Sequence, residues 1–546
     1  MIQIKLNNET KMVPKGTKLL TLLDEKDQKN YYVCLVNGRV RELSFKISFD
    51  AEIEFLGFDH SEAGKAYEAS LRYIMAYAFH ELYPDISVRF SYNVSRSIFC
   101  QVVTPSFHIE RRVVNQIQQK MLDLINLDLP IERVTVSIEE AEKIYRKYNL
   151  IDKIDILKYR PEKVVHLYKC GNYYNYLHSY MVPSTGYLKE FVLRPYSPGI
   201  IIQYPRYELN GQIPVFEEAP TYGRTLKRAY EWAQRIESQT IYQINEKINS
   251  NDLVDFIHVC ETKHSNMLAE LGLKIKEDIE NIRLIAIAGP SSSGKTTFSN
   301  RLRLELMSLG IRPVMISIDD YYLDRDKILP NENGEIDLED INTLDVELFN
   351  QHMYSLINGE EVELPRFDFM KAKRVPGKKV KVDSRSPIII EGIHALNEIL
   401  SASIPKHQKF KIFISPQIQI NIDNHSPIST TDLRLIRRLV RDFQFRNAPA
   451  KRTIGMWPSV RRGEFKWIYP HQEQADYVFN SELTYELCVL KKYAIPLLKD
   501  IEPNDEDFIV ANRLIKYLKY FKSIDENLTP CNSLLREFIG GSCFNV

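Results

Sequence analysis

Residues 282–297 read IRLIAIAGPSSSGKTT, a short apolar run that passes directly into a glycine-rich loop. The run predicts a buried strand, and helical periodicity follows the loop over residues 298–309. A strand, the spacing G-x-x-x-x-G-K-T and a helix, in that order, are the context of a phosphate-binding loop. The alternative is a Gly/Ser-rich loop before an ordinary helix, and the fit of both flanks argues against it.

The residue types of this loop suit the binding of nucleotide phosphates. Glycine at positions 289 and 294 allows a tight turn and a close approach of the backbone to phosphate. Successive N–H groups and the helix N-terminus then face the anion. Lys295 can reach the β- and γ-phosphates, and the Thr296 hydroxyl can ligate magnesium. We therefore predict an ATP-binding loop composed of Gly289, Pro290, Ser291, Ser292, Ser293, Gly294, Lys295, Thr296 and Thr297.

The composition describes a globular protein with no dominant charge. The 546 residues are 44% hydrophobic and 26% charged, and 72 Lys and Arg residues balance 72 Asp and Glu residues. This balance gives no reason to expect nucleic acid or an anionic membrane as a partner. No apolar stretch is long enough to span a bilayer, and the seven cysteines form no C-x-x-C pair. We therefore expect a cytoplasmic protein with reduced thiols.

The order of the predicted elements indicates a multidomain α/β and α+β protein. Residues 1–58 alternate short strands around one helix, and residues 205–280 carry helical periodicity rich in charge. Around and beyond the phosphate loop, apolar strands alternate with helices, which predicts a parallel sheet flanked by helices. The expected boundaries are 1–58, 59–204, 205–280, 281–500 and 501–546, the last being a C-terminal helical tail.

Acidic residues follow two further predicted strands. The run 312–318 is followed by Asp319, and the run 388–390 is followed by Glu391. Because ligands of parallel sheets gather at the carboxyl ends of the strands, we expect both carboxylates beside the phosphate loop. Phosphoryl transfer needs charge neutralisation and a proton acceptor for the attacking hydroxyl. We predict that Glu391 and Thr296 hold magnesium, and that Asp319 and Lys295 are catalytic.

A basic segment, DLRLIRRLVRDFQFR, occupies residues 432–446. Its helical spacing puts guanidinium groups on one face, where planar donors can clamp phosphates. The alternative is a solvated basic face that binds no ligand. We predict that the phosphates of ATP also contact Arg434, Arg437, Arg438 and Arg441.

Together, residues 282–450 resemble uridine kinases of the phosphoribulokinase/uridine kinase branch of P-loop kinases. The matching pieces are GPSSSGKTT, IDDYY, VELPRFDF, IIIEGI and DLRLIRRLVRD. The resemblance implies that Asp319 is the catalytic aspartate, and that Arg434 and Arg437 belong to a lid. The predicted acceptor site consists of Tyr322, Glu339, Asp340, Phe367, Phe369 and, from the basic segment, Arg446.

Two positions depart from the family pattern. Uridine kinases follow a Y-D-F motif with a histidine that reads the pyrimidine edge, whereas the matched residue here is Ala372. The matched tyrosine of the motif is Phe367. We therefore expect phosphoryl transfer with modest selectivity among nucleosides, unless Lys371, Lys373 or an arginine replaces the lost donor.

The first 200 residues resemble the N-terminal part of threonyl-tRNA synthetases. The string VNGRVRELSFKISFDAEIEFL is similar to the TGS domain, a small β-grasp module, and SLRYIMAYAFHELYPD is similar to the helix that opens the second synthetase domain. That family edits with an H-x-x-x-H pair and a C-x-x-x-H pair. The four positions here are Ala69, Tyr73, Leu177 and Met181, which cannot supply such chemistry. We expect the synthetase-like fold without the editing activity.

We therefore predict an ATP- and Mg²⁺-dependent kinase that phosphorylates the 5′-hydroxyl of a nucleoside, uridine or cytidine first, in pyrimidine salvage. One alternative is a kinase of another small hydroxylated metabolite. Another is a nucleotide-switched regulatory protein that binds RNA or a partner. The intact set of Lys295, Thr296, Asp319 and Glu391 argues against a pure switch, because a switch needs no proton acceptor. We expect a small-molecule acceptor, no membrane and no nucleic acid, and leave a homo-oligomer open.

Overall fold

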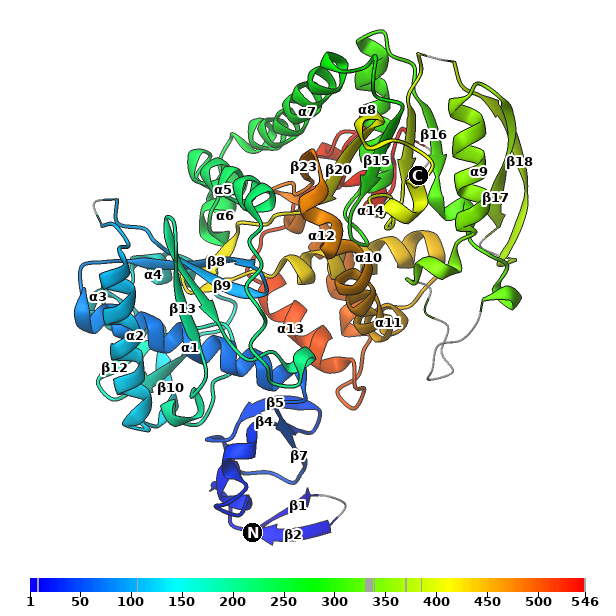
Figure 1. Ribbon diagram of the computed structural model, residues 1–546. Coiled ribbons are helices and arrows are strands. Elements are labelled where there is room, and N and C mark those ends of the chain that lie inside the picture. The colour runs from blue at the N-terminus through cyan, green and yellow to red at the C-terminus, as the bar shows by residue number, and fades with distance from the viewer. Residues whose placement is uncertain are drawn as a thin grey trace.

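The computed structural model describes residues 1–6, 9–105, 107–328, 337, 339–368, 371–383 and 385–544. The chain is a mixed α/β structure with three main regions (Figure 1). We call residues 1–58 the β-grasp region, residues 59–204 the synthetase-like region and residues 281–500 the P-loop region. In Figure 1 they lie at the bottom, the left and the upper right, respectively. No helix among the described residues is long and apolar enough to cross a bilayer.

The β-grasp region is a five-stranded sheet in the order β2-β1-β7-β4-β5. Alternate residues of its first strand, Ile2, Ile4 and Leu6, are buried, which is the pattern of a strand with one face on a core. The helix expected in this region is a single 3-10 turn, Leu19–Leu22. The strands are β1 (Ile2–Leu6), β2 (Glu9–Val13), β3 (Thr17–Lys18), β4 (Tyr31–Val36), β5 (Arg39–Glu42), β6 (Lys46–Ile47) and β7 (Ala51–Gly57).

The synthetase-like region contains the long helix α1 (Ser61–Leu82) and two antiparallel sheets, β10-β11-β12 and β13-β14-β9-β8. α1 begins after His60, whose ring nitrogen Nδ1 accepts a hydrogen bond from the Glu62 N–H at 3.1 Å. The strands are β8 (Val88–Val94), β9 (Ser97–Val102), β10 (Ile131–Ser137), β11 (Val164–Cys170), β12 (Tyr173–Asn175), β13 (Val192–Tyr196) and β14 (Gly199–Gln203). The other helices are α2 (Arg111–Asn126), α3 (Ile138–Lys147) and α4 (Ile151–Leu157).

Three helices connect the synthetase-like region to the P-loop region: α5 (Pro220–Arg235), α6 (Ile241–Asn249) and α7 (Leu253–Glu277). α6 begins with a capping box in which the side chains of Thr240 and Gln243 satisfy each other's backbone N–H groups. Ile244 and Ile257, from α6 and α7, belong to the same buried core as Ile285 of the P-loop sheet. The helices expected as a linker are therefore part of the packing around the P-loop sheet.

The P-loop region is built on a parallel sheet in the order β16-β19-β15-β20-β23. β15 is central, and all its residues are buried because both faces of the sheet are covered. The parallel sheet confirms the fold expected from the sequence, although β23 was not among the predicted strands. The five strands are β15 (Leu284–Ala288), β16 (Val314–Ser317), β19 (Ile388–Glu391), β20 (Lys409–Ser415) and β23 (Tyr477–Asn480).

Helices and a hairpin surround this sheet. The helices are α8 (Lys295–Ser308), α9 (Val346–Ile357), α10 (Thr430–Arg446), α11 (Ala450–Gly463), α12 (Glu486–Lys499), α13 (Phe508–Leu518) and the short α14 (Arg536–Ile539). The antiparallel pair β17 (Glu361–Asp368) and β18 (Lys373–Lys381) lies beside α9 at the right of Figure 1. Leu514 of α13 and Phe538 of α14 are buried in the core that Ile285 shares, so the last helices also complete this region.

A second hairpin of the P-loop region inserts into the synthetase-like region. This docking hairpin, residues 421–427, consists of β21 (Asn421–Asp423) and β22 (Ser426–Pro427) and directly precedes α10. The Lys153 Nζ atom lies 2.6 Å from Oδ1 of Asp423, and the two side chains are only 1% and 0% exposed. Lys153 also donates to the Tyr176 carbonyl at 2.9 Å. A fully buried ion pair therefore joins two regions that are far apart in the sequence.

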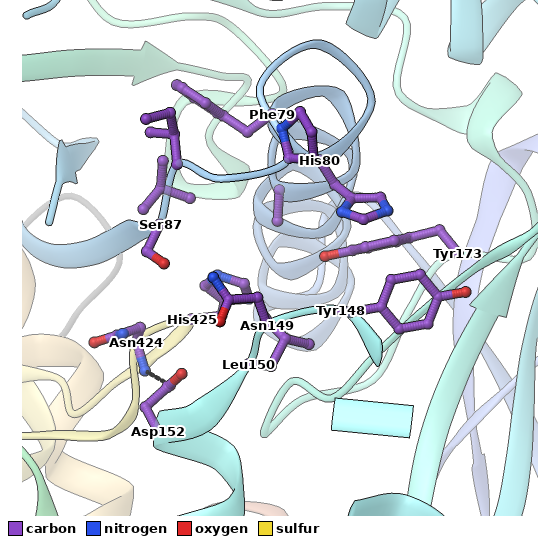
Figure 2. A pocket seen from close by; sticks show the side chains of 14 residues that line it. Phe79, His80, Ser87, Tyr148, Asn149, Leu150, Asp152, Tyr173, Asn424 and His425 are labelled. Atoms are coloured by element: carbon purple, nitrogen blue, oxygen red, sulfur yellow. Dashed lines mark hydrogen bonds between the residues drawn. The ribbon is translucent and has the colours of Figure 1, made fainter. Parts of the chain in front are cut away.

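Further polar contacts hold the docking hairpin. The guanidinium of Arg89 donates to the side-chain oxygen of Asn424 at 3.1 Å, and the Phe90 N–H donates to the Asn424 carbonyl at 2.8 Å. Figure 2 shows Asn424, His425 and Asp152 lining one cavity, with the Asn424 N–H donating to the adjacent Asp152 at 2.7 Å. The cavity measures about 30 Å³. Ligand pockets usually measure roughly 300–1,000 Å³, so this junction is structural.

Replacing Lys153 with methionine is expected to destabilise the protein strongly. The substitution leaves the Asp423 carboxylate buried without its counter-charge, a change that typically costs about 3–5 kcal/mol of unfolding free energy. Lys120→Met is the matched control, because Lys120 pairs with Glu81 at 3.4 Å on the partly exposed surface of the same region. Denaturant unfolding of both variants measures the difference. Equal unfolding midpoints would contradict the role given to the buried pair.

Candidate active site

The phosphate loop connects β15 to α8 and depends on two glycines. A Cβ atom built on Gly289 would lie 2.0 Å from the Ile414 carbonyl oxygen, so only glycine fits beside β20. Gly294 has a φ of +89°, a left-handed conformation that costs glycine little. α8 begins at the next residue, Lys295, and its first N–H groups, which have no partner within the helix, therefore lie at the loop.

Lys295 is folded onto the phosphate loop. Its Nζ atom donates to the carbonyls of Gly289 at 3.0 Å and Pro290 at 3.3 Å. Burial lowers the pKa of Lys295, and the negative charges of Glu391 and Asp319 oppose this shift. The lysine therefore lies close to both carboxylates that the sequence analysis selected. Its ammonium can turn from the carbonyls to a phosphate without leaving the loop.

Asp319 and Glu391 lie at the same edge of the sheet. Glu391 is in register with Ile287 of β15 and Ser317 of β16, and Asp319 follows in the 3-10 turn Ile318–Tyr321. Burial raises the pKa of Glu391 to about 7, and the negative charge of Asp319 adds to the shift. Burial also raises the pKa of Asp319, although the charge of Lys295 opposes it. Two buried carboxylates that repel each other in this way favour a bound cation.

The donor set suits a magnesium ion that arrives with a nucleotide. Magnesium is usually held by one or two carboxylates together with substrate phosphates, rather than by a closed cage of protein ligands. Thr296 is the second residue of α8, and Oε1 of Glu391 accepts a hydrogen bond from the Ser317 hydroxyl at 3.3 Å. Among the residues that the structure describes, no cluster of three or more His, Cys, Asp or Glu side chains is arranged to hold a metal alone. The residues present therefore fit Mg²⁺ bound to ATP.

Two of the arginines predicted to bind phosphate are committed to other partners. Arg434 is 1% exposed and pairs with Glu464, while its Nε donates to the Ser291 carbonyl at 2.9 Å. Arg437 is 0% exposed and donates through Nε to Glu486 at 2.6 Å. Its NH1 group donates to the Ser292 carbonyl at 3.3 Å.

The structure shows both guanidinium groups bound to protein oxygens, and the predicted phosphate contacts of Arg434 and Arg437 stay a prediction. Every side-chain nitrogen of both residues donates to a protein oxygen. The spacing predicted a single cationic helix face, but this part of α10 packs against the loop and buries both guanidinium groups. Both guanidinium groups donate to carbonyls of the phosphate loop, and these bonds position the N–H groups of the loop.

The Asp442 carboxylate forms ion pairs with the other three arginines of α10. Its carboxylate lies 3.2 Å from Arg438, 2.7 Å from Arg441 and 3.6 Å from Arg446. Arg438 also donates to the Ser291 hydroxyl of the phosphate loop at 3.0 Å. Arg438 thus lies beside the loop, and the prediction that Arg438 and Arg441 contact phosphate stays a prediction.

The aromatic residues predicted for the acceptor lie next to Asp319. The rings of Tyr322 and Phe367 meet edge to face, with centroids 5.8 Å apart. The Asp320 carboxylate accepts a hydrogen bond from the Phe367 N–H at 3.1 Å, which ties β17 to the turn that carries Asp319. The structure thus brings an aromatic wall to the carboxylate that we expect to take the acceptor proton.

The two acidic residues predicted for the acceptor site, Glu339 and Asp340, have different surroundings. Burial raises the pKa of Glu339, whose carboxylate lies near Arg438. Asp340 instead accepts from the Asn342 N–H at 2.9 Å and pairs with Lys466 at 3.1 Å, so its carboxylate serves a turn and a surface contact. Burial raises the pKa of Asp319 and the charge of Arg446 opposes this rise, while the place of Arg446 in the acceptor site stays a prediction. Phe369 lies outside the described residues.

Ala372 has a φ of +50°, in the left-handed region, and its carbonyl accepts from the Arg325 N–H at 3.3 Å. The neighbouring Lys371 and Lys373 are exposed, and Arg374 pairs with Asp345 at 2.8 Å. None of these three cations is therefore a buried, uncommitted donor in place of the family histidine.

Sequence analysis did not identify the carboxylates that hold the arginines of α10. Asp442 had a local signal, because it follows Arg438 by four residues, a spacing that pairs side chains on a helix. Glu464 and Glu486 had none, since they lie 30 and 49 residues from the arginines they bind. Only the packing of α10 against α12 and the segment after α11 brings them together.

The four editing positions of the synthetase-like region are filled with buried, non-catalytic side chains. The Tyr73 hydroxyl donates to the carbonyls of Tyr168 and Tyr173 at 3.1 and 3.0 Å, and burial raises its pKa well above the usual value. It is therefore a neutral, committed donor. The four residues, none more than 2% exposed, are Ala69, Tyr73, Leu177 and Met181.

Two parts of the chain are similar to two different kinds of known protein. Residues 284–487 match the model of the "Phosphoribulokinase / Uridine kinase family". A uridine kinase from Halalkalibacterium halodurans is 26% identical over 217 residues, which covers 39% of this chain and 94% of that protein. A solved structure described as a possible uridine kinase from Bacillus stearothermophilus is 22% identical, with a TM-score of 0.26, and covers 42% of this chain and 100% of that one.

The N-terminal half is similar to part of a different enzyme. A threonine–tRNA ligase from Clostridium kluyveri is 29% identical over 194 residues, which is 35% of this chain. The match spans only 30% of that ligase, in its N-terminal region. The synthetase-like resemblance of the first residues is thus confirmed, and the family match supports a P-loop kinase of small metabolites.

The full chain is expected not to hydrolyse a mischarged tRNA, because Ala69, Tyr73, Leu177 and Met181 provide no general acid, base or metal ligand. Loss of radiolabelled amino acid from mischarged threonine tRNA measures this activity. An editing-competent threonine–tRNA ligase is the positive control. Hydrolysis by the wild-type chain that Tyr73→Phe abolishes would contradict this interpretation.

Proposed function

We propose that the protein is a cytoplasmic, ATP- and Mg²⁺-dependent kinase that phosphorylates the 5′-hydroxyl of a nucleoside, uridine or cytidine, in pyrimidine salvage. The observation that carries the proposal is the grouping of Lys295, Asp319 and Glu391 at one edge of the sheet. A loop lysine, a buried carboxylate that can take a proton and a second that can hold a metal are the parts that phosphoryl transfer needs. The similarity to uridine kinases supports a nucleoside as the acceptor.

In the proposed reaction, the 5′-hydroxyl oxygen of the acceptor attacks the γ-phosphorus of ATP and forms a new P–O bond. The bond between that phosphorus and the β–γ bridging oxygen breaks, ADP leaves with the electron pair, and Asp319 takes the hydroxyl proton. Because burial raises the pKa of Asp319, its carboxylate is a better proton acceptor than an exposed aspartate. The Lys295 ammonium stabilises the negative charge on the phosphoryl group as it is transferred.

Glu391 and Thr296 are the residues proposed to hold magnesium. When bound, Mg²⁺ neutralises charge that develops on the β- and γ-phosphate oxygens. Glu391 also keeps negative charge next to Lys295, which favours the charged ammonium at this buried position. Arg438 and Arg441, grouped by Asp442, are proposed to contact the phosphates from α10.

The acceptor is proposed to bind against the rings of Tyr322 and Phe367, with Glu339 available to its sugar hydroxyls. Aromatic faces stack on any base, whereas a donor to the base edge discriminates between bases. Because Ala372 stands where the family has a histidine, we expect uridine, cytidine and other nucleosides to differ only modestly in kcat/KM.

Lys295→Ala is expected to lower the rate of ATP-dependent nucleoside phosphorylation by about 10²–10³-fold, the usual cost of losing one contact that stabilises transition-state charge. Lys371→Ala is the control, because Lys371 is exposed and pairs only loosely with Asp368, at 3.9 Å. Product formation with uridine, followed by ³¹P NMR, measures both variants. Near wild-type turnover in Lys295→Ala would contradict the proposed phosphate loop.

The Mg²⁺ requirement is expected to rise as the pH falls below 7. Since the pKa of Glu391 is raised to about 7, this carboxyl is protonated below that pH and must lose the proton to bind metal. The Mg²⁺ concentration for half-maximal activity should therefore rise about tenfold per pH unit below the pKa and level off above it. Magnesium titrations on either side of this pKa measure the effect.

Two variants separate the carboxylates in this titration. Glu391→Gln is expected to raise the Mg²⁺ requirement at every pH and to remove its pH dependence. Asp319→Asn is expected to lower kcat by about 10²–10⁴-fold, the contribution of a general base, with ATP affinity nearly intact. Equal loss of ATP affinity in Asp319→Asn would instead make Asp319 a metal ligand or a structural residue.

A further inference from the structure

We propose that the segment 533–541, which contains α14, competes with ATP for the phosphate loop through the carboxylate of Glu537. The inference rests on the proposed function, because it concerns regulation of the same site. Oε2 of Glu537 accepts a hydrogen bond from the backbone N–H of Thr297 at 3.0 Å. Thr297 is the third residue of α8, so this N–H belongs to the unpaired donors that a phosphate-loop helix offers to its anion. A carboxylate oxygen of the chain itself thus stands where a phosphate oxygen would bind.

Residues near Glu537 in the segment also pack against the phosphate loop. A Cβ atom built on Gly294 would lie 2.2 Å from Cδ2 of Leu534, so Leu534 rests directly on the second glycine of the loop. The ring of Phe538 lies under the guanidinium of Arg437, 5.0 Å from its centroid, and Arg437 donates to the Ser292 carbonyl. The segment therefore covers the loop by apolar packing as well as by one charged contact.

The negative charge of Glu537 acts on Lys295 and Glu391. It favours the charged form of Lys295, and it adds to the negative charge that raises the pKa of Glu391. A phosphate group bound at the loop would act on both residues in the same sense. Glu537 is therefore an electrostatic substitute for phosphate, besides occupying one of its hydrogen-bond donors.

Anchors on both sides keep the segment docked. The Ser533 hydroxyl donates to Glu261 of α7 at 2.6 Å, and the Arg536 guanidinium donates to the carbonyls of Thr529 at 2.6 Å and Glu526 at 2.9 Å. Glu537 itself has no such tether beyond Thr297 among the hydrogen bonds of the described side chains. The anchors set the position of the segment, and the Glu537 contact is the part that an incoming phosphate can replace.

With competition of this kind, the apparent Kd for ATP equals the intrinsic Kd divided by the fraction of molecules in which the segment is not docked. If about nine molecules in ten are docked, the apparent Kd for ATP is about tenfold higher than the intrinsic one. Glu537→Gln removes the charge and shifts the balance toward the open loop. Glu142→Gln is the matched control: it is the same substitution on a partly exposed carboxylate of the synthetase-like region, which pairs with Arg146 at 2.5 Å.

Isothermal titration of the full chain with ATP, without any acceptor, tests the proposal. Glu537→Gln is expected to bind ATP about threefold to tenfold more tightly than wild type. Glu142→Gln is expected to bind with wild-type affinity. Hydrogen exchange of the wild-type protein provides a readout that needs no variant: the amides of residues 534–540 are expected to exchange faster when ATP is added.

The outcomes separate this inference from the proposed function. Unchanged or weaker ATP binding by Glu537→Gln, or slower exchange of residues 534–540 with ATP, would overturn the competition while leaving the kinase assignment intact. If wild type and both variants bind no ATP, the proposed function fails and this inference fails with it.

Discussion

The buried ion pair between Lys153 and Asp423 determines how the two halves of the protein meet. Burying two charges is costly, and the cost is offset only where geometry and additional hydrogen bonds are good. Here the lysine also binds the Tyr176 carbonyl, and Asp423 also accepts from the His425 N–H at 2.8 Å. The docking hairpin has few positions in which all these bonds are made together, so its place in the synthetase-like region is fixed.

The position of the hairpin matters because α10 starts immediately after it. Asp432, in the first turn of α10, pairs with Arg513 of α13, which gives the helix a second attachment. From there, Arg434 and Arg437 hold the carbonyls of Ser291 and Ser292. The chain thus passes directly from the docking hairpin, which is held in the synthetase-like region, into the helix whose arginines bind the phosphate loop. This gives the N-terminal half a structural reason to be retained, although its editing positions are filled with inert side chains.

Local patterns were sufficient to predict the centre of the site. The loop follows a buried strand, and Asp319 and Glu391 follow two neighbouring strands, so parallel sheet geometry alone brings the three together. The filled editing positions could also be read from residue types, because Ala69 and Leu177 have no polar group in any fold. What the sequence could not supply was the direction in which each arginine of α10 points.

The burial of two arginines of α10 and the other unforeseen contacts share a physical cause. Arg434 and Arg437 are buried because Glu464 and Glu486 approach them from distant parts of the chain. Glu537 and the docking hairpin likewise act through contacts between residues more than 200 positions apart. Helical spacing shows which side chains share a face, but tertiary packing decides whether that face meets solvent, ligand or protein.

ADP release is the most direct measurement of the central claim, which is that this phosphate loop serves the transfer of phosphate to a nucleoside. Wild-type protein with ATP and Mg²⁺ would be offered uridine, cytidine, purine nucleosides, sugars and hydroxy acids in separate reactions. We expect ADP release that depends on a nucleoside, with uridine or cytidine among the best acceptors and modest differences between bases. Release with a sugar or a hydroxy acid, and with no nucleoside, would contradict it.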